Sequence, residues 1–431
     1  MRSKQYLALE HPWAKKLPSG WRYEFFEDLI KDTVDNRGRT VPTSDFGIPL
    51  IATNCISNSS LYPIFKDVRH VSQKTYDEWF RDGHVEPNDI LFANKGENCG
   101  KICLTPNPVN FCFAQDMIGI KVDEKKINFK YLFAILRSRF MKEQLFAFRV
   151  DSVIPHLKKT DFDSIIIPIP PKKLENFIGE CYFSISEKIE NLQNQNKVIE
   201  QIAQAIFKSW FIDFDGVTEF EDSELGKIPK GWQIGILENF LDLTKGVSYK
   251  SQDLKFSNKA LVTLKSVKRG GGYTNIGLKS FDGKYNENQV VKENDIIVAQ
   301  TDLTQNADVI GKPALIRDSK HFDILVASLD IVIIKIKNNK ILKFYIYYLF
   351  LTDRFQNHVY GYTSGTTVLH LAKDAIPNFV FILPPTKTLE KFDKLISTWI
   401  QKNHENNNQI ENLTKIRDFL LPKLMSGEIR V

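Results

Sequence analysis

The chain has 431 residues, of which 42% are apolar and 26% are charged, which excludes a disordered or fibrous protein and leaves room for two or three globular domains. The longest apolar runs, Ile165–Ile169 and Ile331–Ile334, are far too short to span a bilayer, and the first residues do not resemble a signal peptide, so we predict a cytoplasmic protein without membrane contact. The net charge of +6 is compatible with DNA binding through local patches but does not require it.

The first predicted domain spans residues 17–171 and mixes strands with helices. Its β-prone runs are short and are bounded by turn residues such as Asn88-Asp89, and Pro170-Pro171 ends the last of them. The strands are predicted at Ile48–Thr53, Ile90–Ala93, Ile118–Val122 and Ile165–Ile169, and one helix at Tyr131–Phe148.

All five cysteines of the chain, Cys55, Cys99, Cys103, Cys112 and Cys181, lie in the first half. An odd number of cysteines, all in one half of the chain, argues against a disulfide framework. Cys99, Cys103, Cys112 and His84 could together ligate zinc. The second half of the chain has no cysteine, however, so we predict no metal site.

A long helix is predicted over residues 172–214. Its apolar residues fall three, four or seven apart, and this spacing places them on one stripe for about four heptads, as in a coiled coil. The stripe consists of Ile185, Ile189, Leu192, Ile199, Ile202, Ile206 and Trp210. The alternative is an amphipathic helix that packs only on its own domain. An acidic linker, Asp213–Gly231, follows.

The second half of the chain repeats the first. One constant offset in residue number carries Ile185 onto Trp399, His156-Leu157 onto His370-Leu371 and Pro170-Pro171 onto Pro384-Pro385. We therefore predict a second, similar domain at 228–385 and a C-terminal helix at 386–426 that pairs with the central helix. The residues predicted to form the helix-pair and partner interface are Ile185, Leu192, Ile199, Ile206, Trp210, Leu413, Ile416, Leu420 and Leu424.

The order of these features resembles the specificity (S) subunit of type I restriction-modification systems. Each copy begins with a PxGW-like motif, LPSGW (Leu17–Trp21) or IPKGW (Ile228–Trp232), passes through a strand-rich region to Pro-Pro, and continues into a long helix. The resemblance implies a mixed α/β fold in which two similar target-recognition domains are joined by two long antiparallel coiled-coil helices with an internal pseudo-twofold repeat. It further implies double-stranded DNA as a partner, with each domain reading half of a bipartite target.

The same resemblance implies protein partners. The helices would dock methyltransferase subunits, two per chain, and a restriction subunit would join the full complex. No cofactor is expected in this chain, since S-adenosylmethionine would be bound by the methyltransferase partner.

Sequence readout requires hydrogen-bonding side chains on exposed segments that reach base edges. Four loop-like segments meet this description: Asn94–Lys101 and Arg149–Lys159 in the first copy, and Gln300–Lys312 and Tyr362–Lys373 in the second. The candidate DNA-binding residues are Lys95, Asn98, Lys101, Arg149, Ser152, Lys158 and Lys159, together with Gln300, Thr301, Gln305, Lys312, Ser364, Thr366, Thr367 and Lys373. The paired loops differ in sequence, so the half-sites should differ. For His156 and His370 we favour a capping or core role.

The sequence contains few motifs typical of catalytic sites, so we predict a non-catalytic subunit. Neither IPIPPKK nor FILPPTK has the acidic or amide residue and the aromatic residue that a DNA aminomethyltransferase places around Pro-Pro, and no phosphate-binding GxxxxGK[ST] loop occurs. Asp116, Glu124 and Lys126 loosely resemble a nuclease site. Two alternatives to a non-catalytic DNA reader remain: the substrate-binding part of a split endonuclease, with these residues as its site, and a helical scaffold protein.

Overall fold

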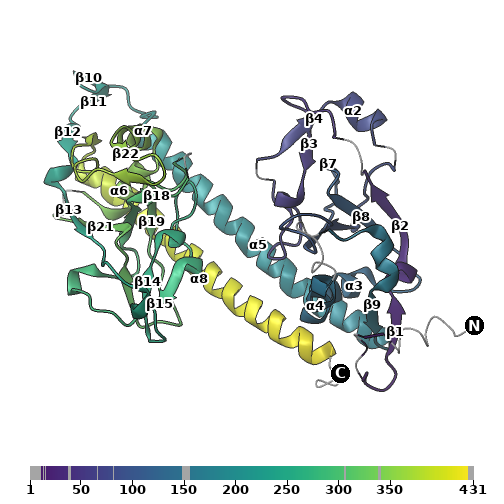
Figure 1. The fold of residues 1–431 in the computed structure, drawn as a ribbon. Helices are drawn as coiled ribbons and strands as arrows, with labels where there is room; N and C mark the ends of the chain where they lie inside the picture. The colour runs from purple at the N-terminus through teal and green to yellow at the C-terminus, as the bar shows by residue number, and fades with distance from the viewer. Residues whose placement is uncertain are drawn as a thin grey trace, which may run out of the picture. The chain divides into compact units, whose positions relative to one another are not determined.

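The computed structural model describes residues 11–12, 14, 16–36, 40–65, 67–80, 82–147, 156–304, 307–337 and 341–425 (Figure 1). The chain divides into two compact units. Unit 1 consists of Met1–Gln195 and Asn406–Val431, and unit 2 consists of Asn196–Glu405. Unit 1 is therefore built from both ends of the chain, whereas unit 2 is one continuous segment.

The described residues of unit 1 form three small sheets. The first is antiparallel, in the order β2 (Ile30–Asp35), β8 (Met117–Val122), β5 (Ile90–Ala93) and β6 (Ile102–Leu104). The second has the order β4 (Arg69–Val71), β3 (Ile48–Ile51) and β7 (Cys112–Phe113), with β3 parallel to β7. The third pairs β1 (Arg22–Phe25) with β9 (Ile166–Ile169), and the short helices are α2 (Gln73–Glu78), α3 (Phe129–Leu136) and α4 (Arg139–Ala147).

Unit 2 repeats this topology. Its first sheet has the order β13 (Leu241–Lys245), β21 (Ile331–Ile336), β17 (Ile296–Ala299) and β19 (Pro313–Leu315). Its second has the order β15 (Leu278–Ser280), β14 (Lys259–Val262), β20 (Ile324–Ala327) and β16 (Val290–Val291), with β14 parallel to β20. β12 (Gln233–Ile236) pairs with β24 (Val380–Leu383), and α6 (Lys343–Phe350) and α7 (Asp353–Gly361) correspond to α3 and α4. Two further sheets are a hairpin of β10 (Phe220–Ser223) and β11 (Gly226–Pro229), and β18 (Thr301–Asp302), β23 (Leu369–Leu371) and β22 (Thr363–Ser364).

The turn before β5 and β17 shows the repeat at the level of the backbone. Asn88 and Asn294 both have positive φ, 70° and 65°, a conformation that asparagine tolerates better than most residues. The following carboxylates accept from a backbone N–H three residues earlier: Asp89 from Glu86 at 2.8 Å and Asp295 from Lys292 at 3.0 Å. The same turn therefore leads into the same buried strand in both units.

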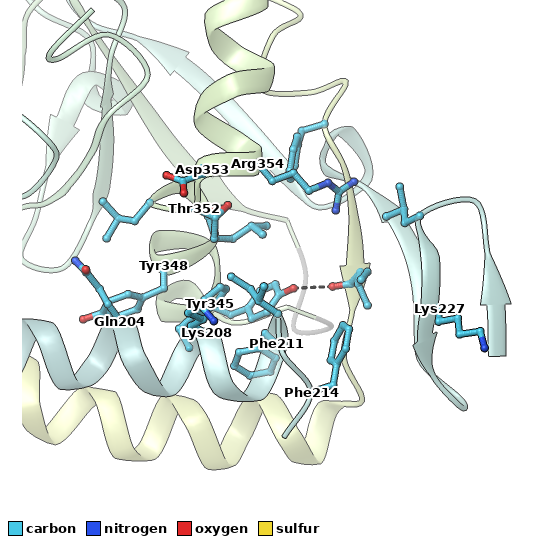
Figure 2. Close-up of a pocket in the computed structure, with 17 residues that line it drawn as sticks. Gln204, Lys208, Phe211, Phe214, Lys227, Tyr345, Tyr348, Thr352, Asp353 and Arg354 are labelled. Carbon is cyan, nitrogen blue, oxygen red and sulfur yellow. Dashed lines mark hydrogen bonds between the residues drawn. The ribbon is translucent and has the colours of Figure 1, made fainter. Parts of the chain in front are cut away.

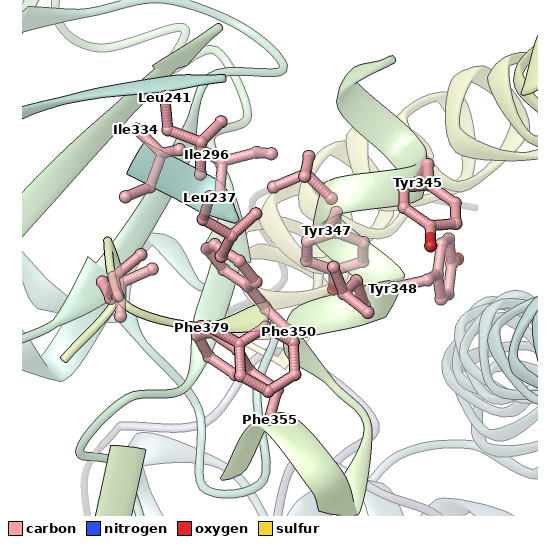
Figure 3. Close-up of a cluster of buried hydrophobic side chains, with 14 of the residues drawn as sticks. Leu237, Leu241, Ile296, Ile334, Tyr345, Tyr347, Tyr348, Phe350, Phe355 and Phe379 are labelled. Carbon is pink, nitrogen blue, oxygen red and sulfur yellow. The ribbon is translucent and has the colours of Figure 1, made fainter. Parts of the chain in front are cut away.

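The core of unit 2 is rich in aromatic rings (Figure 3). Helix α6 contributes five of them, all buried: Phe344, Tyr345, Tyr347, Tyr348 and Phe350. Phe350 stacks on Phe355 of α7 with ring centroids 4.1 Å apart, which fixes the angle between the two short helices.

Two helices of 40 residues each, α5 (Lys172–Phe211) and α8 (Thr386–Met425), contribute segments to both units. In unit 1 the Arg417 guanidinium of α8 lies over the Tyr182 ring of α5 at 5.6 Å, and Asn406 donates to Gln195 at 3.4 Å. In unit 2 the rings of Phe392 and Phe207 lie 5.7 Å apart. In unit 1 the contacts that move forward along α5 move backward along α8, so the two segments are antiparallel there, as predicted. Supercoiling of the pair stays a prediction.

The inward stripe of the helices differs from the predicted one. Leu192 and Leu424 are buried; Ile185, Ile199, Ile206, Trp210, Leu413 and Leu420 are half-buried. Ile202 and Ile416, however, are 44% and 46% exposed. In unit 2 the buried positions of α5 are Ala203, Phe207 and Phe211, one residue further on. Placing Ile202 and Ile416 on the seam was therefore wrong, because the apolar face is wider than the seam and spacing alone does not locate its centre. Among the described residues no helix is long and apolar enough to cross a membrane.

Candidate nucleic-acid interface

In unit 1 the two predicted reading segments meet. The loop after β5 and the segment before Ile165 are joined by a bridge between Lys95 and His156. The Leu157 N–H donates to the Asn94 carbonyl at 2.8 Å, and the Asn94 N–H donates to the Asp116 carbonyl at 3.1 Å. Segments that lie far apart in sequence thus form one surface.

Unit 2 joins its segments in the same way. Thr301 of β18 pairs with His370 of β23, the Leu371 N–H donates to Gln300 at 2.9 Å, and the Gln300 N–H donates to Asp330 at 2.8 Å. Because the same backbone contacts occur in both units, each unit presents one composite surface made from the two predicted segments.

The predicted DNA-binding residues differ in their exposure to solvent. The exposed ones are Lys95, Lys158, Lys159, Ser364, Thr366, Thr367 and Lys373. The partly buried ones are Asn98, Lys101, Gln300, Thr301 and Lys312. Arg149, Ser152 and Gln305 lie outside the described residues. No bound DNA tests any of these contacts, so they stay predictions.

Some predicted residues are held by their own unit. The Asn98 amide donates to the Thr53 carbonyl at 2.9 Å and accepts from the Lys101 ammonium at 2.5 Å, which ties the loop to the turn after β3. The Thr301 hydroxyl donates to the Asp330 carboxylate at 3.1 Å. These side chains shape the loops, whereas Lys95, Lys158 and Lys159 of unit 1 and Ser364 and Thr367 of unit 2 are exposed.

Asp302 is a structural residue that the sequence reasoning missed. Its buried carboxylate accepts from the backbone N–H groups of Thr304, Val309 and Ile310, at 2.7, 2.6 and 3.1 Å. Burial alone would raise the pKa of Asp302, but these donors outweigh it and lower the pKa below its usual value. An Asp followed two residues later by Thr is an Asx-turn signal that could have identified it.

Two more polar residues depart from expectation. Lys312 is half-buried, and burial lowers the pKa of its ammonium while the carboxylates of Asp353 and Asp308 oppose this effect. His370 is exposed in the centre of a three-stranded sheet, so a core role is wrong for it, whereas His156 is half-buried. The strand position of His370 is set by backbone pairing, which the His-Leu dipeptide alone does not reveal.

The structure does not gather the loose nuclease-like set. Asp116 precedes β8 and Glu124 and Lys126 follow it, and the strand's 6 residues, at about 3.3 Å each, separate the two ends by roughly 20 Å. No group of three His, Cys, Asp or Glu residues that could hold a metal occurs within the described ranges. Cys103 and Cys112 are core residues, and burial raises the pKa of Cys112 to about 12.

Unit 2 also has an aromatic pocket of about 700 Å³ (Figure 2). It lies among the end of α5, the segment 214–227 and the α6–α7 pair, and Tyr345 donates from its hydroxyl to the Ile382 carbonyl at 2.6 Å. The rings of Phe207, Phe211 and Phe214 share the lining with the cations Lys208, Lys227 and Arg354. None of its lining residues belongs to the predicted reading segments.

Comparison with known proteins finds relatives that match this chain over most of its length. The family model described as "Type I restriction modification DNA specificity domain" matches twice, at residues 41–201 and 229–417. The MjaIX specificity subunit of a Methanocaldococcus jannaschii type I restriction enzyme is 27% identical, covering 96% of this chain and 95% of that protein. The HindI specificity subunit of Haemophilus influenzae is 20% identical, over 80% of this chain and 87% of that one. The crystal structure of a type I S subunit from M. genitalium has a TM-score of 0.56 at 16% identity, covering 96% of this chain and 99% of that one, which supports the fold.

Proposed function

The chain belongs to the family of type I restriction-modification DNA specificity subunits, and from that premise we propose that units 1 and 2 each read one half of a bipartite DNA target. The main support for this proposal is that the same junction of two loop segments occurs once in each unit. A pair of similar readers can address two half-sites of one duplex. Because the loops differ, as NKGENCGK does from QTDLTQNADVIGK, the half-sites should differ as well.

The exposed cations and hydroxyls on these surfaces suit the task. Lys95, Lys158 and Lys159 in unit 1 can neutralise phosphates, whereas Ser364, Thr366 and Thr367 in unit 2 can hydrogen-bond to phosphates or base edges. Phosphate contacts would position each unit on the duplex, and base-edge contacts would select the sequence.

We further propose that α5 and α8 dock two methyltransferase subunits, one on each copy of the repeat. The supporting feature is an exposed isoleucine at equivalent positions of the two helices. Ile202 and Ile416 are exposed and stand at equivalent positions, related by the same offset that joins Ile185 to Trp399. Each has an exposed apolar neighbour about one turn away, Val198 on α5 and Phe419 on α8. Exposed apolar side chains grouped in this way are typical of protein-protein contact sites.

In this proposal the chain itself performs no chemistry. Methyl transfer belongs to the methyltransferase subunits, which would bind S-adenosylmethionine, and cleavage belongs to a restriction subunit of the full complex. Support comes from the dispersed carboxylates of unit 1, which do not form the arrangement that a split endonuclease site needs. The surfaces formed by the loops likewise favour a DNA reader over a helical scaffold.

A domain exchange tests the proposal. Residues 17–171 would be replaced by the equivalent segment of a relative, and methylated genomic motifs would be mapped in cells that also express the methyltransferase. We expect one half of the motif to change and the other half to persist, whereas the purified chain alone should transfer no methyl group. A change in both halves would show that the units do not read independently, and methyl transfer by the chain alone would contradict the non-catalytic role.

A further inference from the structure

Unit 1 has a small polar hollow beside the loop Asn94–Lys101, here called the reading loop, and none of the predicted DNA-binding residues lines it. Its volume is about 160 Å³, and it is lined by Thr40, Val41, Ala52, Thr53, Arg69, Ala114, Gln115 and Asp116. The reading loop is attached to its edge, because Asn98 donates to the Thr53 carbonyl at 2.9 Å and the Asn94 N–H donates to the Asp116 carbonyl at 3.1 Å.

The side chains of Arg69, Gln115 and Asp116 have unused hydrogen-bonding capacity. Within the described part of the chain none of the three makes a side-chain hydrogen bond or ion pair, although a guanidinium and a carboxylate share the same hollow. Polar groups in a concave surface are usually paired within the protein. These three are accessible to solvent, Arg69 most of all, and can therefore turn towards a ligand.

The corresponding place in unit 2 has a different chemistry. In unit 1, Leu50 of β3 lies between Cys112 of β7 and Arg69 of β4. In unit 2, Leu261 of β14 lies between Val326 of β20 and Lys279 of β15. Because the offset of the repeat relates Cys112 to Val326, Lys279 is the counterpart of Arg69. The offset of the repeat makes Leu329 the counterpart of Gln115 and Asp330 that of Asp116. The Asp330 carboxylate is already engaged by the Thr301 hydroxyl at 3.1 Å. The set of an unpaired arginine, amide and carboxylate is thus specific to unit 1.

We propose that Arg69 and Asp116 are specificity-determining residues of unit 1, and that together they read one G·C base pair in the major groove. An arginine donates to guanine O6 and N7, and an aspartate accepts from the cytosine N4 amino group, so the two groups complement the two bases of one pair. A volume of about 160 Å³ corresponds to roughly five waters at about 30 Å³ each, so the base pair stays stacked while the side chains reach out from the rim. Gln115, between them, adds a donor and an acceptor.

This inference rests on the proposed function and is tested with the assembled methyltransferase complex. Arg69→Lys keeps the charge but loses the forked donor geometry, Arg69→Ala removes both, and Asp116→Asn removes the charge and replaces one acceptor with a donor. Arg139→Ala is the matched control, because Arg139 is an exposed arginine of unit 1 on α4, 2.7 Å from its own partner Glu143. Gel filtration verifies that each variant still assembles.

The readouts are the methylated motif in cells and competition binding by duplexes that carry single base-pair changes. We expect the Arg69 and Asp116 variants to lose about ten- to hundredfold discrimination at one G·C position of a single half-site, with the other half-site and the control unchanged. Full discrimination at every position would overturn the inference. So would an equal loss of affinity for all sequences with a shallower salt dependence, which is the behaviour of a phosphate contact. Either result leaves the bipartite motif of the wild-type complex intact, and only the absence of that motif would count against the proposed function.

Discussion

Single residues show what the sequence reveals and what it hides. The pairs Asn88-Asp89 and Asn294-Asp295 mark the same turn in both copies because short polar side chains satisfy a local backbone N–H, so the motif is readable without a structure. The role of Asn98 is not readable in this way. Its amide is fixed by Thr53, which lies far earlier in the sequence, and such a contact exists only once the strands have paired.

Asp89 gives a pH-dependent prediction. The side chain is 5% exposed, and burial raises its pKa to about 6 from an ordinary value of 3.8. Well below pH 3.8 the carboxyl is protonated in both the folded and the unfolded chain, so the shift has no effect there. Between about pH 4 and 6 the unfolded state ionises first, so stability falls as pH rises, by about 3 kcal/mol at most.

We therefore expect Asp89→Asn to raise the unfolding temperature of the full chain at about pH 7.5 and to raise it much less near pH 4, because Asn keeps the acceptor for the Glu86 N–H. Calorimetry at the two pH values measures this. The matched control is Asp295→Asn, which should give no gain because its carboxylate lies 3.8 Å from the Lys343 ammonium. A gain under the acidic condition as large as that under the neutral one would argue against the titration of Asp89.

At the scale of elements, the repeat was predictable and the exact helix face was not. A duplicated unit leaves many independent traces in sequence, such as Pro170-Pro171 and Pro384-Pro385. The face of α5 is less determined, because Ile199, Ile202 and Ile206 have the correct spacing while Ala203 and Phe207, one position on, provide the buried contacts. Only the partner helix decides between neighbouring stripes.

The exposed isoleucines of α5 and α8 give a prediction for assembly. Ile202→Asp and Ile416→Asp should each change the unfolding free energy by less than about 0.5 kcal/mol, as exposed substitutions do, but should weaken methyltransferase binding. Because there is one such isoleucine per copy, each single variant should retain one methyltransferase subunit, and the double variant should retain none. Native mass spectrometry of the complex counts the subunits.

The comparison variant is Phe207→Ala, whose side chain is buried. It should cost about 3–5 kcal/mol of stability by opening a cavity in unit 2, so loss of partner binding there would accompany unfolding. Full binding of two subunits by the Ile202→Asp, Ile416→Asp double variant would show that the partner docks elsewhere.

At the scale of the whole molecule, unit 1 is assembled from two distant parts of the chain. Leu421 and Leu424 at the end of α8 pack in the same core as Ile178 and Tyr182 of α5. In unit 2, by contrast, the described residues of the core all lie within the continuous segment Asn196–Glu405. Two units with the same topology therefore depend on the C-terminus to different degrees.

Deleting Asn406–Val431 should therefore destabilise unit 1 and spare unit 2. Removing two buried leucines and their helix strips one face of the unit 1 core, which should cost several kcal/mol, since burying each leucine contributes about 1.5–3 kcal/mol. Hydrogen exchange should become faster in β5 and β8 and remain slow in β17 and β21. Equal protection of all four strands would contradict the discontinuous core.

The same arrangement sets an order of events during biosynthesis. The ribosome releases Met1–Gln195 long before the helix segment that completes their core, because the whole of Asn196–Glu405 must be translated in between. At about 5–20 residues per second, translation of that stretch lasts roughly 10–40 s. During this interval the apolar surface around Ile178 and Tyr182 lacks its native cover, and nascent-chain chaperones have time to occupy it. The unit that is translated first is thus the last to finish folding.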